Sequence, residues 1–136
     1  MSNATGARGS PSRVTTLRKR AEFLRVRKGL RYATAAFVLE AKARPEASTQ
    51  APILSGPRFG FTVTRQIGHA VERNRIRRRL KAAVKDAGLR QARSGFDYVL
   101  IARRPALTAP FSVLADDLAR AIARMHKTPH GAQHAR

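Results

Sequence analysis

The sequence RFGFTVTRQIGHAVERNRIRRRLK, residues 58–81, decides the fold because it contains two different hydrophobic periods. Its first part alternates between apolar and small or polar side chains, as a strand with one buried face does. From residue 70 onward, apolar residues recur at the spacing of one helical face. The strand face consists of Phe59, Phe61 and Val63, and the helix face consists of Ile76, Leu80, Ala83, Val84 and Ala87. We therefore predict a strand over residues 58–65 and a helix over residues 70–87.

The ends of this helix and the neighbouring elements follow from similar signals. Glu72 in the first turn complements the helix dipole, and Gly88 is expected to end the helix just beyond its last turn. Alternation predicts further strands over residues 32–41 and 97–103. A short basic helix is expected to end near Gly29. A closing helix is expected from about Ser112, with an apolar stripe at Leu114, Leu118, Ala121, Ile122 and Met125.

The predicted order is helix, strand, strand, helix, strand, helix. A helix between two strands that are not hairpin partners implies a crossover, and so an α/β (α+β) two-layer sandwich. The length of 136 residues fits one domain, which we place at residues 14–126. A proline-containing flexible loop is expected over residues 44–57, and disordered tails over 1–13 and 127–136. The composition of the first tail is shared by transit peptides and by disordered tails. Because no apolar periodicity occurs before Val14, we favour the disordered tail.

Charge is the abnormal feature of the composition. The chain has 28 Lys and Arg against 8 Asp and Glu, a formal net charge of +20, so a polyanionic partner is expected. The absence of Cys excludes disulfides, thiolate metal sites and Cys nucleophiles. No apolar run approaches the length of a membrane helix, and we expect a cytoplasmic protein that is monomeric when alone and makes no membrane contact.

The densest basic segment lies within the predicted helix, where six of the nine residues from Arg73 to Lys81 are basic. The side of the helix opposite the apolar stripe consists of Asn74, Arg75, Arg78, Lys81 and Lys85, with Arg77 and Arg79 flanking the stripe. A merely solvated helix usually places acids among its bases, whereas here like charges repel at i,i+4 spacing. Because a guanidinium binds phosphate in bidentate fashion, this pattern indicates a phosphate-binding face.

The run from Phe59 to Lys81 resembles the signature of the bacterial ribonuclease P protein subunit: a strand, then Gly-x-Ala-Val, then Arg-Asn-Arg-Ile-x-Arg. The resemblance extends to the stretches 17–23 and 97–103, and covers about residues 15–126. It implies a small sandwich like one ribosomal-protein domain, in which the central basic helix makes a left-handed crossover between parallel strands.

The resemblance also implies a function. This chain would be the non-catalytic, RNA-binding and tRNA-binding subunit of an endoribonuclease whose catalyst is a large RNA. The ribonucleoprotein removes the 5′ leader of precursor tRNA with Mg²⁺ held mainly by the RNA, and uses no organic cofactor or metal site in the protein. By position, the catalytic RNA and the start of the leader would meet the set Arg73, Asn74, Arg75, Arg77, Arg78, Arg79, Lys81 and Lys85. The single-stranded leader would run in a cleft at Phe23, Arg27, Thr62 and Arg65.

Stacking and charge make this assignment physically reasonable, because single-stranded RNA suits a groove with an aromatic floor and a basic rim. Phe23 taken alone also fits a core position, in helical register with Val26. The chain departs from its relatives at Arg27, where a second cleft aromatic is frequent, and at Gln66, where a second basic residue is common. His69 stands where many relatives have Asn, and we expect a turn or cap role for it.

Three other readings stay open at the level of sequence. A DNA-binding basic region would need a long heptad dimer after the basic run, whereas here Gly88 and a strand follow. A ribosomal or other structural RNA-binding protein shares both the charge and the expected fold. A protein-only nuclease would want clustered carboxylates, but only Asp116 and Asp117 are adjacent among the acids.

Overall fold

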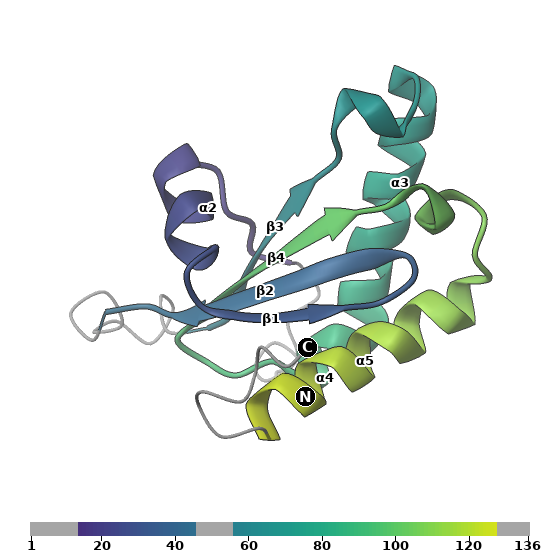
Figure 1. Cartoon of the computed structure of the whole chain (residues 1–136). Helices are drawn as coiled ribbons and strands as arrows, with labels where there is room; N and C mark the ends of the chain where they lie inside the picture. The colour runs from purple at the N-terminus through teal and green to yellow at the C-terminus, as the bar shows by residue number, and fades with distance from the viewer. Residues whose placement is uncertain (1–13, 46–55, 128–136) are drawn as a thin grey trace, which may run out of the picture.

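The computed structural model describes residues 14–45 and 56–127. Its four strands form one sheet, and Figure 1 shows helices packed against that sheet. The predicted tail 1–13, most of the predicted loop 44–57 and most of the tail 127–136 lie outside the described residues. Helices α3 (Ala70–Ala83) and α5 (Phe111–Lys127) pack together against one face of the sheet. The short helix α2 (Arg20–Val26) lies over part of the other face. The predicted mixed α+β sandwich is confirmed.

The sheet has the spatial order β1-β2-β4-β3. Its strands are β1 (Leu30–Ala33), β2 (Phe37–Ala43), β3 (Arg58–Thr62) and β4 (Phe96–Ala102). Strands β1, β2 and β4 pair antiparallel, whereas β3 and β4 are parallel neighbours. Parallel neighbours need a crossover connection, and α3 makes it, as predicted. The left-handed sense of this crossover stays a prediction.

The single strand predicted over residues 32–41 is wrong, because the structure has two strands there. Residues 34–36 turn the chain between β1 and β2, so the observed order has three strands before α3. The turn is closed by the Thr34 amide, which donates to the Phe37 carbonyl at 2.8 Å, and by the Phe37 amide, which donates to Thr34 Oγ1 at 3.1 Å. A threonine side chain thus replaces the Gly, Pro or Asn that usually marks a turn.

The main core fills the space between the sheet and the pair α3 and α5. Phe59 and Tyr98, on the parallel strands β3 and β4, are fully buried and stack with ring centroids 4.9 Å apart. The predicted apolar faces of both helices are confirmed, since every one of these side chains is buried: Ile76, Leu80, Ala83, Val84, Ala87, Leu114, Leu118, Ala121, Ile122 and Met125.

Gly88 does not end the central helix, which corrects that prediction. After α3 the chain makes one π-helical turn, η4 (Val84–Gly88), and then the short helix α4 (Leu89–Gln91). Gly88 is buried with ordinary helical dihedral angles, and a Cβ there would lie 2.9 Å from Leu118 Cδ2 of α5. The glycine therefore allows close packing of two helices rather than a helix stop.

The segment before α2 lies along the free edge of β3. The Leu17 amide donates to the Phe59 carbonyl, and the Phe59 amide donates to the Thr15 carbonyl, each at 2.8 Å. Leu17 and Val26 then form a second, small core with Val99 of β4. This arrangement fixes α2 above the sheet, as Figure 1 shows.

We predict that Leu80→Ala lowers the free energy of unfolding by about 2–5 kcal/mol, because it leaves a cavity where a fully buried side chain was. Arg78→Ala, on the exposed side of the same helix, is the matched control and should change the free energy of unfolding by less than about 0.5 kcal/mol. Urea denaturation followed by circular dichroism measures both. Equal losses in the two variants would contradict the orientation of α3.

Candidate RNA-binding site

The outer face of α3 presents the basic side chains that the sequence predicted. The members of the predicted set that are exposed are Asn74, Arg75, Arg77, Arg78, Lys81 and Lys85. Four of these, Asn74, Arg77, Arg78 and Lys81, line a shallow hollow. The Arg77 guanidinium donates to Asn74 Oδ1 at 3.1 Å, so the asparagine orients a neighbouring guanidinium. The sequence prediction of a cationic helix face therefore matches the geometry.

Two arginines of the predicted set are directed to the backbone instead. Arg79 is partly buried, and its guanidinium donates to the carbonyls of Ala106 and Ala109, which fastens α3 to the segment after β4. Arg73 is also partly buried and donates through Nε to the Gly68 carbonyl at 3.2 Å. These hydrogen bonds give Arg73 and Arg79 a structural role. Sequence periodicity did not distinguish these two arginines from those on the exposed face.

The start of α3 is fixed by an ion pair. His69 occupies the N-cap position, as predicted, and its backbone amide donates to Glu72 Oε1 at 3.1 Å. Arg104 pairs with Glu72 at 3.0 Å and also donates to the Ile67 carbonyl at 2.6 Å. The hydrogen bonds from Arg104 and from the His69 amide lower the pKa of Glu72 to about 2. Glu72 is therefore a charged anchor at neutral pH.

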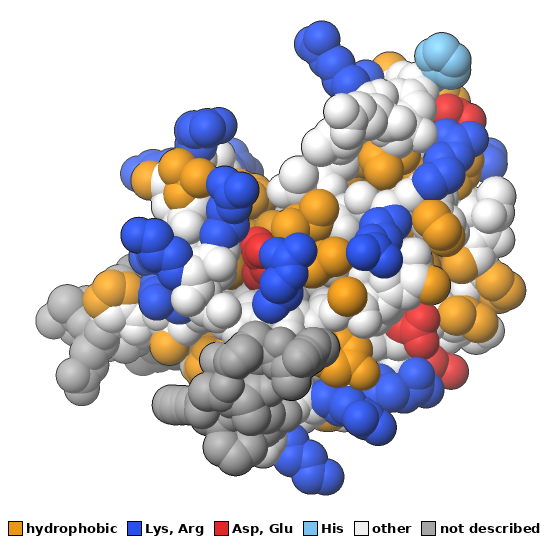
Figure 2. Space-filling view, in the orientation of Figure 1, with side chains coloured by type: hydrophobic (Ala, Val, Ile, Leu, Met, Phe, Trp, Pro, Cys, Tyr) orange, Lys and Arg blue, Asp and Glu red, His pale blue; other side chains and the backbone are white. Residues whose placement is uncertain are grey.

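A cleft of about 660 Å³ lies between α2, the sheet and α3. Figure 2 shows it as a notch with hydrophobic side chains on its floor and Lys and Arg side chains beside it. Its cationic lining consists of Arg18, Arg20, Arg27 and Arg77, and its apolar lining consists of Phe23, Leu24, Phe61, Val63, Val99 and Ile101, with Thr62 and Glu40. An apolar floor with a cationic rim suits single-stranded nucleic acid, whose bases stack while its phosphates meet the rim.

Three of the four predicted cleft residues line this cleft: Phe23, Arg27 and Thr62. Arg65 is exposed in the short 3-10 helix η3 (Arg65–Ile67) beyond the end of β3, and does not contribute to the lining. Sequence reasoning missed Arg18 and Arg20, whose position on the cleft depends on how α2 sits on the sheet. It assigned Arg77 only to the helix face, whereas the structure also places it at the cleft wall.

Phe23 belongs both to the cleft and to the small core. Its side chain is partly buried, packs with Leu17, Val26 and Val99, and also lines the cleft. Gly60 of β3 makes this position possible, since a Cβ on Gly60 would lie 2.5 Å from Phe23 Cε2. The ring can therefore lie directly on the backbone of β3.

Glu40 is an acid beside this basic cleft. It is 2% exposed, and its Oε2 accepts from the Arg31 guanidinium at 2.8 Å. Burial raises the pKa of Glu40, although Arg31 and Arg27 oppose that shift. Two cations therefore face this one carboxylate, and the cleft stays positive overall.

The wall formed by α2 depends on Asp97 of β4. Asp97 is fully buried, and its carboxylate accepts hydrogen bonds from Arg25 at 2.8 Å, from Arg44 at 2.6 Å and from both Nε and Nη2 of Arg58 at 2.9 Å. Arg58 also pairs with Glu22 of α2 at 3.1 Å. One carboxylate thus joins α2, the end of β2 and β3.

Three guanidiniums reverse what burial would do to this acid. Desolvation would raise the pKa of Asp97, but the hydrogen bonds from Arg58, Arg44 and Arg25 lower the pKa below the ordinary value. Arg44 is itself 8% exposed and also donates to the Gly56 carbonyl at 2.6 Å. The first residue of the predicted flexible loop is therefore fixed in the structure rather than mobile.

Metal ligands do not converge in the part of the chain that the structure describes. Among residues 14–45 and 56–127, no three His, Cys, Asp or Glu side chains gather as a metal-binding group would require. Nor does any described helix combine the length and apolar character needed to cross a membrane.

Comparisons with known proteins agree with this geometry. The Ribonuclease P family model matches residues 12–126. The ribonuclease P protein component of Brucella suis is 47% identical over 114 residues, covering 83% of this chain and 81% of the relative. That of Bartonella quintana is 45% identical over 115 residues, with 84% of both chains covered.

Solved structures show the same fold. The ribonuclease P protein of Staphylococcus aureus matches with a TM-score of 0.63 and 25% identity, over 83% of this chain and 98% of that one. The ribonuclease P protein of Thermotoga maritima matches with a TM-score of 0.65 and 23% identity, over 80% and 96% of the two chains.

The fold and the cationic site define a small, basic α+β protein of the kind found in ribonucleoproteins. The chain belongs to the ribonuclease P protein family, whose members are the protein components of a tRNA-processing endoribonuclease. Membership implies an RNA partner and decides against the DNA-binding and ribosomal-protein readings.

We predict that Asp97→Asn lowers the free energy of unfolding at pH 7 by about 3–5 kcal/mol, because it leaves the buried Arg44 and the partly buried Arg25 and Arg58 without their counter-charge. Asp117→Asn, which removes one partner of the surface pair with Arg120, is the control and should cost at most about 1 kcal/mol. Urea denaturation measures both.

The pH dependence gives a second readout for Asp97. A carboxyl whose pKa is lower in the folded state stabilises the protein above its unfolded pKa of about 3.9, and this stabilisation is lost as the pH falls toward the folded value. The stability difference between wild type and Asp97→Asn should therefore narrow below about pH 4. A difference that stays constant down to pH 2 would contradict the ion network.

Proposed function

We propose that this chain helps a catalytic RNA to remove the 5′ leader of precursor tRNA, by binding the RNA through α3 and the leader through the cleft. The observation that supports this most is the presence of two different cationic surfaces that meet at Arg77, which lines both the hollow on α3 and the cleft. The hollow on α3 is lined by cationic side chains of a single helix, which suits contact with RNA phosphates. The cleft adds a ring and apolar side chains, which suit unpaired bases.

In this proposal the reacting groups belong to the RNA. Mg²⁺ ions would be held mainly by the RNA and would supply the activated water and leaving-group stabilisation for hydrolysis. The protein's part is to place the leader and to offset phosphate repulsion, which reduces the bulk Mg²⁺ needed for assembly. With its charge of +20, the chain would repel its own copies and stay monomeric when alone. Its place of action would be the cytoplasm.

Reconstituted cleavage tests this proposal. Precursor tRNA is incubated at low Mg²⁺ with the protein, with the cognate catalytic RNA, and with both together. We expect cleavage at the leader junction only with both, and no cleavage with the protein alone. Cleavage by the protein without RNA would contradict the proposal, and so would catalytic RNA that works equally well with and without the protein.

The cleft assignment predicts a specific effect of Gly60→Ala. The added Cβ collides with the Phe23 ring and must displace it. We expect roughly 10-fold weaker holoenzyme affinity for precursor tRNA, since losing one stacked base costs about 1–3 kcal/mol. Affinity for mature tRNA, which has no leader, should not change.

Gly56→Ala is the matched control for this substitution, because a Cβ at Gly56 meets nothing within 4 Å. Binding is measured by equilibrium titration of labelled substrates, and thermal melts confirm that both variants fold. If Gly60→Ala weakened binding of precursor and mature tRNA equally, Phe23 would have no part in leader binding.

A further inference from the structure

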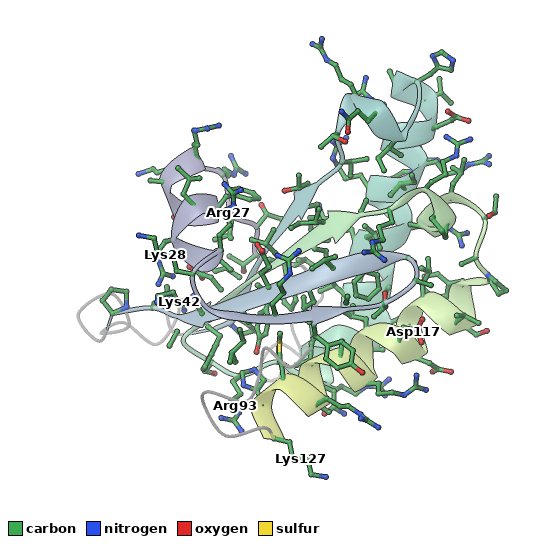
Figure 3. The ribbon with its side chains drawn as sticks, viewed as in Figure 1. Arg27, Lys28, Lys42, Arg93, Asp117 and Lys127 are labelled. Atoms are coloured by element: carbon green, nitrogen blue, oxygen red, sulfur yellow. The ribbon has the colours of Figure 1, made fainter. Side chains whose placement is uncertain are left out.

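Apart from the α3 hollow and the cleft, which meet at Arg77, the protein has a separate basic surface, here called the second basic surface, at the opposite end of α2 from the cleft residues Arg18 and Arg20. It is a hollow of about 600 Å³ whose cationic lining consists of Lys28, Lys42 and Arg93 and whose remaining lining consists of Gly29, Leu30, Ala41, Ala43, Phe96, Met125 and His126. Figure 3 shows Lys28 and Lys42 beneath α2, and Arg93 and Lys127 near the end of α5. None of these residues belongs to the α3 face or to the cleft.

The cations of this second basic surface have no acidic partners. Within residues 14–45 and 56–127, Lys28, Lys42 and Arg93 form no salt bridge. Asp97 lies across from Lys42 in the β2–β4 register, but its carboxylate is already occupied by three guanidiniums. Among the described residues, no Asp or Glu lines the hollow. The positive charge is therefore available to a ligand.

Aromatic rings complete the lining. Phe96 and His126 meet edge to face with centroids 4.6 Å apart, and His126 Nε2 lies 2.6 Å from the Tyr98 hydroxyl. Burial and the nearby Arg93 lower the pKa of His126 to about 4, so the imidazole is neutral at pH 7 and shares a hydrogen bond with the Tyr98 hydroxyl. The surface thus combines fixed neutral rings with cations, which is the chemistry that binds unpaired nucleotides.

The frame of this surface is rigid. Gly29 brings the backbone after α2 against β2 so closely that a Cβ there would lie 2.1 Å from the Ala41 carbonyl oxygen. The Arg93 amide donates to the Tyr98 hydroxyl at 2.8 Å, and the Arg93 guanidinium donates to the His126 carbonyl at 3.3 Å. Lys28 and Arg93 are therefore held on either side of the hollow by separate elements.

The second basic surface is continuous with the cleft along the chain. Arg27 lines the cleft, and the next residue, Lys28, lines the hollow. Figure 3 shows both side chains at α2, so Lys28 lies near a strand that leaves the cleft past Arg27. We propose that the second basic surface binds single-stranded RNA, namely the leader nucleotides that lie beyond the cleft. This inference rests on the proposed function.

Leader length provides the test. Reconstituted holoenzyme is titrated with precursor tRNAs whose leaders are about 8 and about 20 nucleotides long, lengths that one or two single-strand sites can cover. We expect Lys42→Gln/Arg93→Gln to weaken binding of the long-leader substrate about 10-fold at 0.15 M salt, and to leave the short-leader substrate unchanged. For the long-leader substrate, the slope of log affinity against log salt should be less steep in this variant by about 1.4. The variant loses two phosphate contacts, and each phosphate on a single strand contributes about 0.7 to the slope.

Two further variants make the result decisive. Arg103→Gln/Arg120→Gln removes the same charge from residues that line neither surface, and should weaken both substrates equally or not at all. Lys28→Gln/Lys42→Gln leaves the Arg93 hydrogen bonds intact, so it replaces the first variant if thermal melts show that one to be destabilised. Lys28→Gln/Lys42→Gln should weaken binding of the long-leader substrate by the same factor, about 10-fold.

Outcomes separate this inference from the proposed function. A wild-type preference for the short leader over mature tRNA, without further gain from the long leader, would overturn the second basic surface and leave the cleft intact. Equal loss of both substrates in Lys42→Gln/Arg93→Gln would also overturn it, since the surface would then contact the catalytic RNA or the tRNA body. No preference for any leader would contradict the proposed function itself.

Discussion

The buried carboxylate of Asp97 is the interaction on which the arrangement of the cleft depends. It accepts hydrogen bonds from three arginines that come from α2, from the segment after β2 and from β3. In a chain with a net charge of +20, three guanidiniums gathered without an acid would repel one another strongly. With the Asp97 carboxylate between them, the three guanidiniums are held together, and Arg25 thereby ties α2 to the sheet. Together with the small core of Leu17, Val26 and Val99, this ion network holds the wall of the cleft in place.

The arginines of this protein accordingly have two roles: some stabilise the fold, and others stay exposed on the proposed RNA-binding surfaces. Arg25, Arg44 and Arg58 converge on Asp97, and Arg79 donates to backbone carbonyls, so these four stabilise the fold. Others, such as Arg78 on α3 and Arg20 on α2, stay exposed. The planar guanidinium suits both tasks, because it satisfies a buried carboxylate and binds phosphate with equal geometric fit. High arginine content therefore reflects folding as well as RNA partnership.

Hydrophobic period predicted most of the fold. The helix face through Ile76 and Leu80 and the stripe of α5 are confirmed because each has a long, regular pattern with one buried side. The strand predicted over residues 58–65 is present but shorter, since β3 spans Arg58–Thr62, and Gly60 on its second face is also buried, under Phe23 of α2. The hairpin between β1 and β2 was missed because Thr34 closes its turn without glycine or proline. Gly88 was read as a helix stop, since local sequence does not show that Leu118 packs against it.

The candidate site was predictable only in part, for a related reason. The basic face of α3 depends on one helix, so periodicity identified it, and the resemblance to a family placed Phe23 and Thr62 in a cleft that the structure contains. The Asp97 network and the second basic surface each join residues from at least three segments far apart in the sequence. Such groupings arise from tertiary packing, and no local pattern specifies them.

The central claim is that α3 faces the catalytic RNA while the cleft holds the leader, and site-specific crosslinking tests it most directly. Because the native chain has no Cys, Thr62→Cys and Arg78→Cys each introduce one unique attachment point for a photoreactive probe. In the assembled holoenzyme with precursor tRNA, the probe at position 62 should crosslink to leader nucleotides and the probe at position 78 to the catalytic RNA. Crosslinks from both positions to the catalytic RNA, with none to the leader, would contradict the account.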